Sequence, residues 1–234
     1  MQEATAAERD LVRRLTDGVE GFLSDDEAVY LMRLAASGRG EGAIVEIGSY
    51  HGKSTVLLAH ATRAAGREPV VAIDPHLGGA VKPFHDTLAR GGVTDHVKPV
   101  VATSDAAAET WRGPIRLLWI DGSHVYDQVL RDFRNWTPFL VDGGIVAFHD
   151  TYEYDGVRRV IDEEVAPSRD LVMVGLVDTI TAFRRELRPD VRERIRKRLM
   201  PLGRSLFSRH NRWRLRGTMR KGLKRLLRQT SQTT

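Results

Sequence analysis

The chain has 234 residues, of which 41% are hydrophobic and 29% are charged, so it can bury the core of one α/β domain but not of two large ones. It contains no cysteine, which excludes disulfides, thiolate metal sites and a cysteine nucleophile, and which fits a reducing compartment. No apolar run approaches the roughly 20 residues of a membrane span, and residues 1–5 lack the basic start of a signal peptide. We therefore expect a cytoplasmic protein.

The predicted elements begin with a helix that a capping box opens. Ser24 can accept a hydrogen bond from the Glu27 amide while the Glu27 carboxylate accepts one from the Ser24 amide. The helix is predicted to reach Leu34, and Gly38 and Gly40 end it. Apolar strands and helices then alternate, with strands at 43–47, 69–73, 97–101, 115–120 and 145–148 and helices at 53–65, 83–90, 105–111 and 125–136.

Each of these strands is interpreted as a continuous apolar run, which indicates burial on both faces of a parallel sheet. A further helix at 155–165 precedes strands at 171–177 and 179–184, and only Asp178 separates the two strands. That spacing predicts a hairpin added to the sheet edge. Together the elements predict a doubly wound, mostly parallel, Rossmann-like α/β fold.

The last part of the chain has a different character. Residues 189–234 carry 15 Lys or Arg against two acids, so of the formal net charge of +5 they contribute +13 and the first 188 residues contribute −8. Apolar residues recur at helical spacing over 191–228, broken at Pro201 and Gly203. Such a basic amphipathic pattern is typical of helices that lie on anionic membrane surfaces, which would make the protein peripheral at a membrane. A solvated, partly disordered tail is the alternative.

The segment from Val45 to Thr55 predicts a loop that binds a small-molecule cofactor. Gly48 and Gly52 let the backbone approach a ligand, and the helix that follows offers free N–H groups to a carboxylate or a phosphate. A Walker A loop needs four residues between its first glycine and the Gly-Lys pair, whereas three separate these glycines, and Gly-x-Gly-x-x-Gly is absent. The pattern suits a ligand with an amino-acid end and a ribose.

Polar residues follow five successive strands, where a parallel sheet places its ligand. They are Glu46, Asp74, Ser104 with Asp105, Asp121 with His124, and His149 with Asp150. Asp74 lies about 22 residues after Gly52, the spacing at which an acid accepts both hydroxyls of a cofactor ribose. Asp121 and the His149-Asp150 pair would meet from neighbouring strands, and hard oxygen ligands of this kind suit Mg²⁺.

Four segments carry a resemblance to a known family: 46–48, 71–74, 118–124 and 143–151, which read Glu-Ile-Gly, Val-Ala-Ile-Asp, Leu-Trp-Ile-Asp-Gly-Ser-His and Gly-Gly-Ile-Val-Ala-Phe-His-Asp-Thr. They resemble class I S-adenosylmethionine-dependent methyltransferases, and more narrowly the metal-dependent sugar O-methyltransferases of the macrocin and mycinamicin group. The resemblance covers roughly residues 21–185. The chain departs from the pattern at Tyr50, where many members have a third glycine, and at His149, where metal-binding relatives have a carboxylate.

The resemblance implies a seven-stranded sheet and assigns a role to each candidate residue. The methionine portion of S-adenosyl-L-methionine would lie at Glu46, Gly48, Ser49, Gly52 and Ser54, its ribose at Asp74 and its adenine at Ser104 and Asp105. Mg²⁺ would be held by Asp121 and Asp150, and His124 would act as the base; the residue pattern adds His149 as a third metal ligand at the margin of the site. His51, His76 and His85 are weaker candidates for the acceptor pocket. Residues 1–40 would form helices over the pocket, 41–188 the catalytic domain and 189–234 the tail.

This interpretation predicts an O-methyltransferase that acts on a hydroxyl of a sugar or glycoside, either a small molecule or an oligosaccharide. A phenolic or catechol-type acceptor is the alternative, since the same metal site would serve. A P-loop-like nucleotide-binding protein and a binding module with a degenerate catalytic core are more distant alternatives. An RNA methyltransferase with the tail as a phosphate clamp is disfavoured, because no Asn-Pro-Pro-Tyr-like motif and no aromatic-rich strand is present. Nucleic acid is thus not an expected partner. A second copy of the chain, in a homo-oligomer, is a partner that the sequence leaves open.

Overall fold

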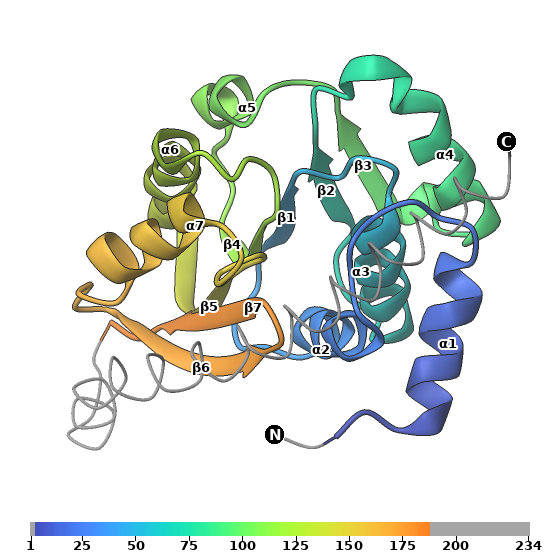
Figure 1. Cartoon of the computed structure of the whole chain (residues 1–234), viewed down its shortest axis with the longest axis horizontal. Helices are drawn as coiled ribbons and strands as arrows, with labels where there is room; N and C mark the ends of the chain where they lie inside the picture. The colour runs from blue at the N-terminus through green and yellow to red at the C-terminus, as the bar shows by residue number, and fades with distance from the viewer. Residues whose placement is uncertain (1–2, 188–234) are drawn as a thin grey trace, which may run out of the picture. The chain divides into compact units, whose positions relative to one another are not determined.

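A mixed seven-stranded sheet organises the part of the chain that the computed structural model describes, residues 3–187 (Figure 1). Its strands lie in the order β3-β2-β1-β4-β5-β7-β6. The first five are parallel, and β7 runs antiparallel to both β5 and β6. The strand bounds are β1 Ala43–Ile47, β2 Val70–Ile73, β3 Val97–Val100, β4 Ile115–Ile120, β5 Leu140–Phe148, β6 Leu171–Val177 and β7 Ile180–Arg185. The predicted doubly wound fold with an antiparallel edge hairpin is confirmed.

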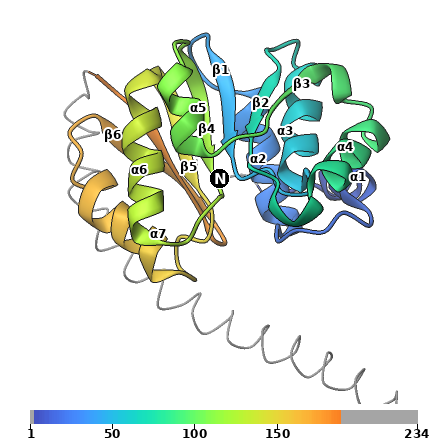
Figure 2. The ribbon, with the colours of Figure 1, turned by 90° about the horizontal axis from the view of Figure 1, so that it is seen from above.

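Helices cover both faces of this sheet, and Figure 2 shows α5, α6 and α7 on one side with α1, α3 and α4 on the other. Alternate strand residues such as Ile44, Leu117 and Trp119 pack with α2 and α3 in one apolar core. On the opposite face, the Phe133 ring of α6 contacts the Phe148 ring of β5. The helices are α1 Ala6–Thr16, α2 Asp25–Ala36, α3 Lys53–Ala64, α4 Val81–Arg90, α5 Ser104–Thr110, α6 Tyr126–Trp136 and α7 Asp155–Val160.

The predicted capping box at the start of α2 is present, with the Glu27 amide 3.1 Å from the Ser24 hydroxyl and the Ser24 amide 2.9 Å from the Glu27 carboxylate. A second capping box, which the sequence analysis did not single out, joins Thr5 to Glu8 at the start of α1. The end of α7 also differs from its prediction, because the helix continues at Ile161–Val165 as a π-helical turn.

The prediction that every strand is buried on both faces is wrong for β3. This strand pairs only with β2 at the edge of the sheet, and its residues Lys98 and Pro99 are exposed. Proline has no backbone N–H to donate, and it is tolerated there because one side of an edge strand has no neighbouring strand. The parallel strands inside the sheet, β1, β2 and β4, are buried almost throughout, as predicted.

No helix among residues 3–187 is both long enough and apolar enough to cross a membrane. The basic segment 189–234, for which a membrane-surface role was predicted, lies outside the described residues.

A buried arginine in β4 closes the carboxyl end of α2. Arg116 is only 2% exposed, and its guanidinium donates to the carbonyl oxygens of Ala35, at 2.6 Å, and Ser37, at 2.9 Å. It also pairs with the Glu68 carboxylate. The last carbonyls of a helix have no partner within the helix, so this side chain satisfies groups that burial would otherwise leave unpaired. Arg116 thus fastens α2 to the sheet.

Replacing Arg116 with methionine should lower the free energy of unfolding by about 2–3 kcal/mol, because the α2 carbonyls and the Glu68 carboxylate lose their donor. Urea denaturation followed by circular dichroism would measure this. The exposed Arg112, changed to methionine in the same way, should stay within about 0.5 kcal/mol of wild type. Equal effects of the two changes would contradict the capping role.

Candidate active site

A cavity of about 700 Å³ opens where β1, β2, β4 and β5 end. Its walls come from the residues after these strands, from the start of α5 and from the loop that joins α1 to α2. Parallel strands that end side by side leave their following loops splayed, which creates a crevice at this edge of the sheet. The volume lies within the range of small-molecule sites.

The glycine loop after β1 is shaped by its contact with the neighbouring loop. Gly48 has φ +89°, and a Cβ there would lie 2.4 Å from the backbone oxygen of Asp121. Gly52, with φ +82°, begins α3 against the ring of Phe84. The sequence pattern predicts that these glycines let a ligand approach the backbone. In the structure they let the loop after β1 pack against the loop after β4 and against α4.

Glu46 lies away from the cavity. Its carboxylate is fully buried, and it accepts a hydrogen bond of 2.5 Å from the Thr55 hydroxyl of α3. Burial raises the pKa of Glu46 to about 8, although the hydroxyls of Ser54 and Thr55 favour the charged form. Of the predicted methionine-side residues, Gly48, Ser49 and Ser54 line the cavity, whereas Glu46 and Gly52 do not.

Asp74, at the end of β2, lines the cavity with a fixed carboxylate. It accepts hydrogen bonds from the backbone N–H of Tyr50, at 2.8 Å, and of His76, at 2.6 Å. Both donors have positive φ, +41° and +47°, so the chain bends on either side of the acid to present its amides to it. An anchored carboxylate in this place retains lone pairs that can accept hydroxyl groups.

The start of α5 contributes Ser104 and Asp105 to the opposite wall. The Ser104 hydroxyl accepts from the indole N–H of Trp136 at 2.8 Å. The Asp105 carboxylate is engaged by Arg131 at 3.2 Å and by the Asn135 amide at 3.0 Å. Both predicted adenine-side residues therefore face the cavity, and α6 holds each of them.

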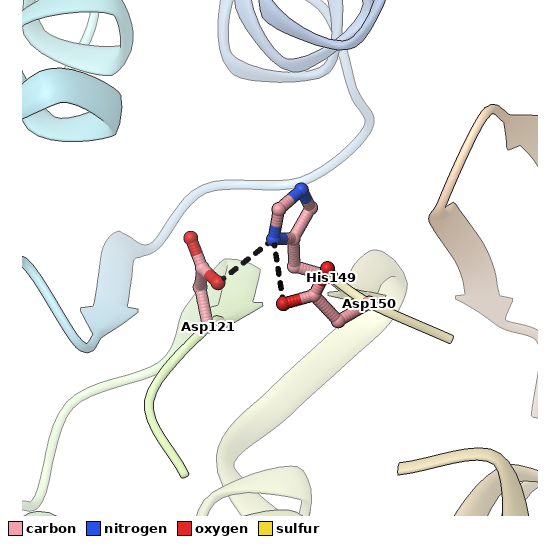
Figure 3. Close-up of side chains that lie close together, drawn as sticks. All are labelled: Asp121, His149 and Asp150. Carbon is pink, nitrogen blue, oxygen red and sulfur yellow. Dashed lines mark hydrogen bonds and ion pairs between the residues drawn. The ribbon is translucent and has the colours of Figure 1, made fainter. Parts of the chain in front are cut away.

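Three predicted metal ligands from two neighbouring strands meet at the floor of the cavity (Figure 3). Asp121 follows β4, and His149 and Asp150 follow β5, so their parallel pairing brings the side chains together. One ligand atom of each lies within 4.8 Å of the others. His149 Nδ1 is 3.0 Å from Asp121 Oδ1 and 3.4 Å from Asp150 Oδ2.

His124 joins this cluster from the loop before α6. Its Nε2 lies 2.8 Å from Asp150 Oδ2, and its ring is stacked on Tyr154 with centroids 3.8 Å apart. The predicted base and the predicted metal ligands thus share one carboxylate. His51 also lines the cavity, whereas His76 is buried against Phe84 and His85 is exposed on α4.

The charges of the cluster are strongly coupled. Burial opposes a charge on His149, but the nearby carboxylates of Asp121, Asp150 and Glu27 outweigh it and raise the pKa of the imidazole well above its usual range. Burial likewise opposes a charge on Asp150, yet the bonds from His124 and His149 hold the pKa of its carboxyl below the usual range. With no metal bound, the cluster therefore keeps a proton on His149.

Glu27 is a site residue that sequence analysis identified only as a helix cap. Its Oε1 accepts from the backbone N–H of Thr179 at 2.8 Å and from the Thr179 hydroxyl at 2.6 Å. Its Oε2 lies 3.6 Å from His149 Nε2. No sequence signal separates this role from capping, because the partners are brought to Glu27 by the sheet order alone.

The loop between α1 and α2 forms a side wall of the cavity. Lys53 donates to the Gly21 carbonyl oxygen at 2.8 Å, and Glu20 lies 3.4 Å from His51. Phe22, at the tip, is 89% exposed and lines the cavity. Of residues 1–40, which were predicted to cover the pocket, the loop between α1 and α2 is therefore the part that lines the cavity.

The central part of the chain is similar to known proteins. Residues 45–151 match the model of a family described as a methyltransferase domain. The match spans just under half of the chain, and over these residues the chain is similar to that domain. An uncharacterized protein of Sinorhizobium fredii, y4gI, is 30% identical over 117 residues, a match that covers 46% of this chain and 13% of that protein's length.

Solved structures with the same fold include methyltransferases that act on different acceptors. CalS11, described as a TDP-rhamnose 3'-O-methyltransferase of calicheamicin biosynthesis, has a TM-score of 0.54 and 18% identity over 79% of this chain and 96% of its own. TomG of Streptomyces achromogenes, an O-methyltransferase in complex with S-adenosylmethionine, has a TM-score of 0.57 and 16% identity; the match covers 80% of this chain and 92% of TomG. An rRNA methylase of Streptococcus thermophilus has a TM-score of 0.52 and 18% identity; the match covers 67% of this chain and 94% of the methylase. At these identities the likeness establishes the fold.

The buried Glu46 predicts how stability depends on pH. Its pKa is higher in the folded chain than in the unfolded one, so its contribution to stability is complete below about pH 4.5 and is lost as the pH rises through about 8. The Glu46→Gln variant should therefore gain stability relative to wild type with rising pH, by at most about 1.4 kcal/mol per pH unit between pH 5 and 8. Urea denaturation across this range measures the difference. The exposed Glu109→Gln change should give none.

Proposed function

We propose that the protein transfers a methyl group from S-adenosylmethionine to a hydroxyl of a sugar or glycoside. The observation that carries the proposal is that one cavity holds both an anchored acid at the end of β2 and the cluster of Asp121, His124, His149 and Asp150. The first suits a ribose and the second suits a hydroxyl that must lose a proton. The description of CalS11 as a rhamnose methyltransferase is consistent with this acceptor class.

The cofactor half of the cavity offers the groups that such a donor needs. Asp74, Ser104 and Asp105 all line the cavity, which supports assigning Asp74 to the two ribose hydroxyls and Ser104 and Asp105 to the adenine. The loop 48–54 leads into the start of α3, whose first N–H groups favour a carboxylate. S-adenosylmethionine brings an activated methyl group, so the protein has mainly to position the acceptor and to remove its proton.

The cluster of Asp121, His149 and Asp150 fits a divalent metal ion. Its ligand atoms converge, since His149 Nδ1 lies 3.0 and 3.4 Å from the two aspartate oxygens and all three side chains line the cavity, so these residues would hold the ion. The chemistry that such an ion supplies is Lewis acidity, which lowers the pKa of a hydroxyl beside it.

His124 is the residue that takes the proton from the acceptor hydroxyl. Asp150 accepts from its Nε2, which leaves Nδ1 as the basic nitrogen, and the stacked Tyr154 ring fixes the plane of the imidazole. A histidine is suited to this step because its pKa lies near neutral pH. Because Asp150 and Tyr154 hold the imidazole in position, less conformational entropy is lost when the ring is oriented for proton transfer.

A phenolic or catechol-type acceptor is the second candidate, and one observation favours it. Three of the large apolar side chains that are exposed among residues 3–187 line the mouth of this cavity: Phe22, at 89%, Leu77, at 80%, and Tyr50, at 45%. Apolar side chains at the mouth of a site favour an acceptor with an aromatic or aliphatic face. An acceptor screen should therefore include sugars, glycosides and phenols.

Calorimetric titration with S-adenosylhomocysteine tests the cofactor assignment. The wild-type protein should bind it with micromolar affinity and should not bind ATP. Asp74→Asn should weaken binding at least tenfold, about 1.4 kcal/mol, because the ribose hydroxyls lose a charged acceptor. Asp86→Asn, on the exposed face of α4, should leave it unchanged. Binding of ATP alone would overturn the proposal in favour of a phosphate-binding loop.

The His124→Asn variant tests the base. Its rate of methyl transfer at saturating substrate should fall by about 10²- to 10⁴-fold, because the acceptor hydroxyl has no group to take its proton. The affinity for S-adenosylhomocysteine should stay within twofold of wild type, and the exposed His85→Asn variant should retain full activity. A loss of less than tenfold in the His124 variant would remove it from the mechanism.

A further inference from the structure

We propose that the metal site of this protein is selective for a borderline transition ion of the Fe²⁺ to Zn²⁺ series over Mg²⁺, because His149 supplies a nitrogen ligand. The inference rests on the proposed function, which places a divalent ion between Asp121, His149 and Asp150. It replaces the Mg²⁺ that the sequence resemblance implies. Imidazole suits Fe²⁺, Co²⁺, Ni²⁺ and Zn²⁺, whereas Mg²⁺ takes carboxylate oxygens and water.

The nitrogen of His149 is at the centre of the cluster. Nδ1 lies 3.0 Å from Asp121 Oδ1 and 3.4 Å from Asp150 Oδ2, and Figure 3 shows it facing both carboxylates. An ion bound between these two carboxylate oxygens would therefore lie within reach of Nδ1. A hard ion would have to accept a nitrogen ligand there or lose one of the protein's three ligand positions.

The imidazole is also held so that it cannot turn away. His149 is 5% exposed, and its ring packs against the buried Trp119 with centroids 5.6 Å apart. On its far side, Nε2 lies 3.6 Å from Glu27 Oε2. A histidine ligand commonly directs its second nitrogen at a carboxylate, which keeps the N–H on that nitrogen and leaves the other free for the metal. Here the Glu27 carboxylate lies 3.6 Å from Nε2, on the side of the ring away from the two aspartates.

Glu27 is itself fixed by the fold. Its second carboxylate oxygen, Oε1, is bonded to the Thr179 amide and hydroxyl in the turn between β6 and β7, and its Oε2 accepts from the Ser24 amide at the start of α2. The arrangement Glu27–His149–metal site thus spans three separate segments of the chain. This order is characteristic of a ligand set built around an imidazole.

The test is calorimetric titration of the EDTA-treated and dialysed full-length protein with CoCl₂ and with MgCl₂. Transition ions bind most sites more tightly than Mg²⁺, so the decisive quantity is the change of the Co²⁺-to-Mg²⁺ affinity ratio between variants. His149→Asp should lower this ratio at least tenfold, because a third carboxylate replaces the nitrogen. The matched His85→Asp change, which removes an exposed imidazole of α4, should leave the ratio unchanged.

Proton NMR of the Co²⁺ protein gives a second measurement that does not depend on activity. A coordinated imidazole should show a paramagnetically shifted, exchangeable N–H resonance, which His149→Asp abolishes and His85→Asp retains. His149→Asn, which removes the imidazole without adding a negative charge, should also abolish the resonance and lower Co²⁺ affinity at least tenfold. It serves as the test if the aspartate variant does not fold.

An unchanged affinity ratio in the His149 variants, or the absence of any ion bound by the wild-type protein at millimolar concentration, would overturn the inference. In the latter case His149 would bridge the two carboxylates itself. Titration of the same samples with S-adenosylhomocysteine separates this failure from that of the proposed function. Binding of S-adenosylhomocysteine without binding of an ion leaves the methyltransferase assignment standing, whereas absence of both overturns it.

Discussion

The contact between Gly48 and the backbone of Asp121 sets the distance between the two halves of the site. A side chain at position 48 would overlap the Asp121 carbonyl oxygen, so only glycine lets the loop after β1 lie against the loop after β4. The first loop leads to Asp74 through the Tyr50 amide, and the second carries Asp121 into the cluster with His149. Because the two backbones are in direct contact, Asp74 and the cluster of Asp121 and His149 are fixed relative to one another.

The acidic cluster is stable because each charge faces an opposite charge or a donor. His149 lies among three carboxylates, and the burial that disfavours its charge is overcome by their combined field. The same principle applies to two buried groups outside the cluster. Arg116 is buried because the carbonyls of α2 and Glu68 receive its hydrogen bonds, and Glu46, which has hydroxyl partners alone, responds to burial with a raised pKa. Partners therefore decide which of the buried groups remain charged.

The N-terminal segment belongs to the site as much as the sheet does. The loop after α1 lines the cavity through Phe22 and is held by Lys53, while α2 delivers Glu27 to His149. The matched family segment, residues 45–151, includes neither of these parts. Features that distinguish this protein from others with the same sheet are thus expected in the helices that precede the matched segment.

The sequence by itself determined the order of strands and helices along the chain, the capping box at Ser24 and the set of polar residues that follow the strands. These features depend on local patterns: runs of apolar residues, turn residues and the identity of the residue at each strand end. For this reason Asp121, His149 and Asp150 could be predicted as one cluster once a parallel sheet was inferred.

Only the tertiary structure decided which of these residues face the cavity. Glu46 and Asp74 both lie at or near strand ends, but Glu46 is directed at Thr55 of α3 and Asp74 at the cavity. Lys98 and Pro99 are exposed because β3 is an edge strand, and strand order is not encoded in any local pattern. Glu27 reaches His149 because β7 inserts between β5 and β6 and brings the Thr179 turn beside α2. Contacts between distant segments arise from packing, which no short window of sequence specifies.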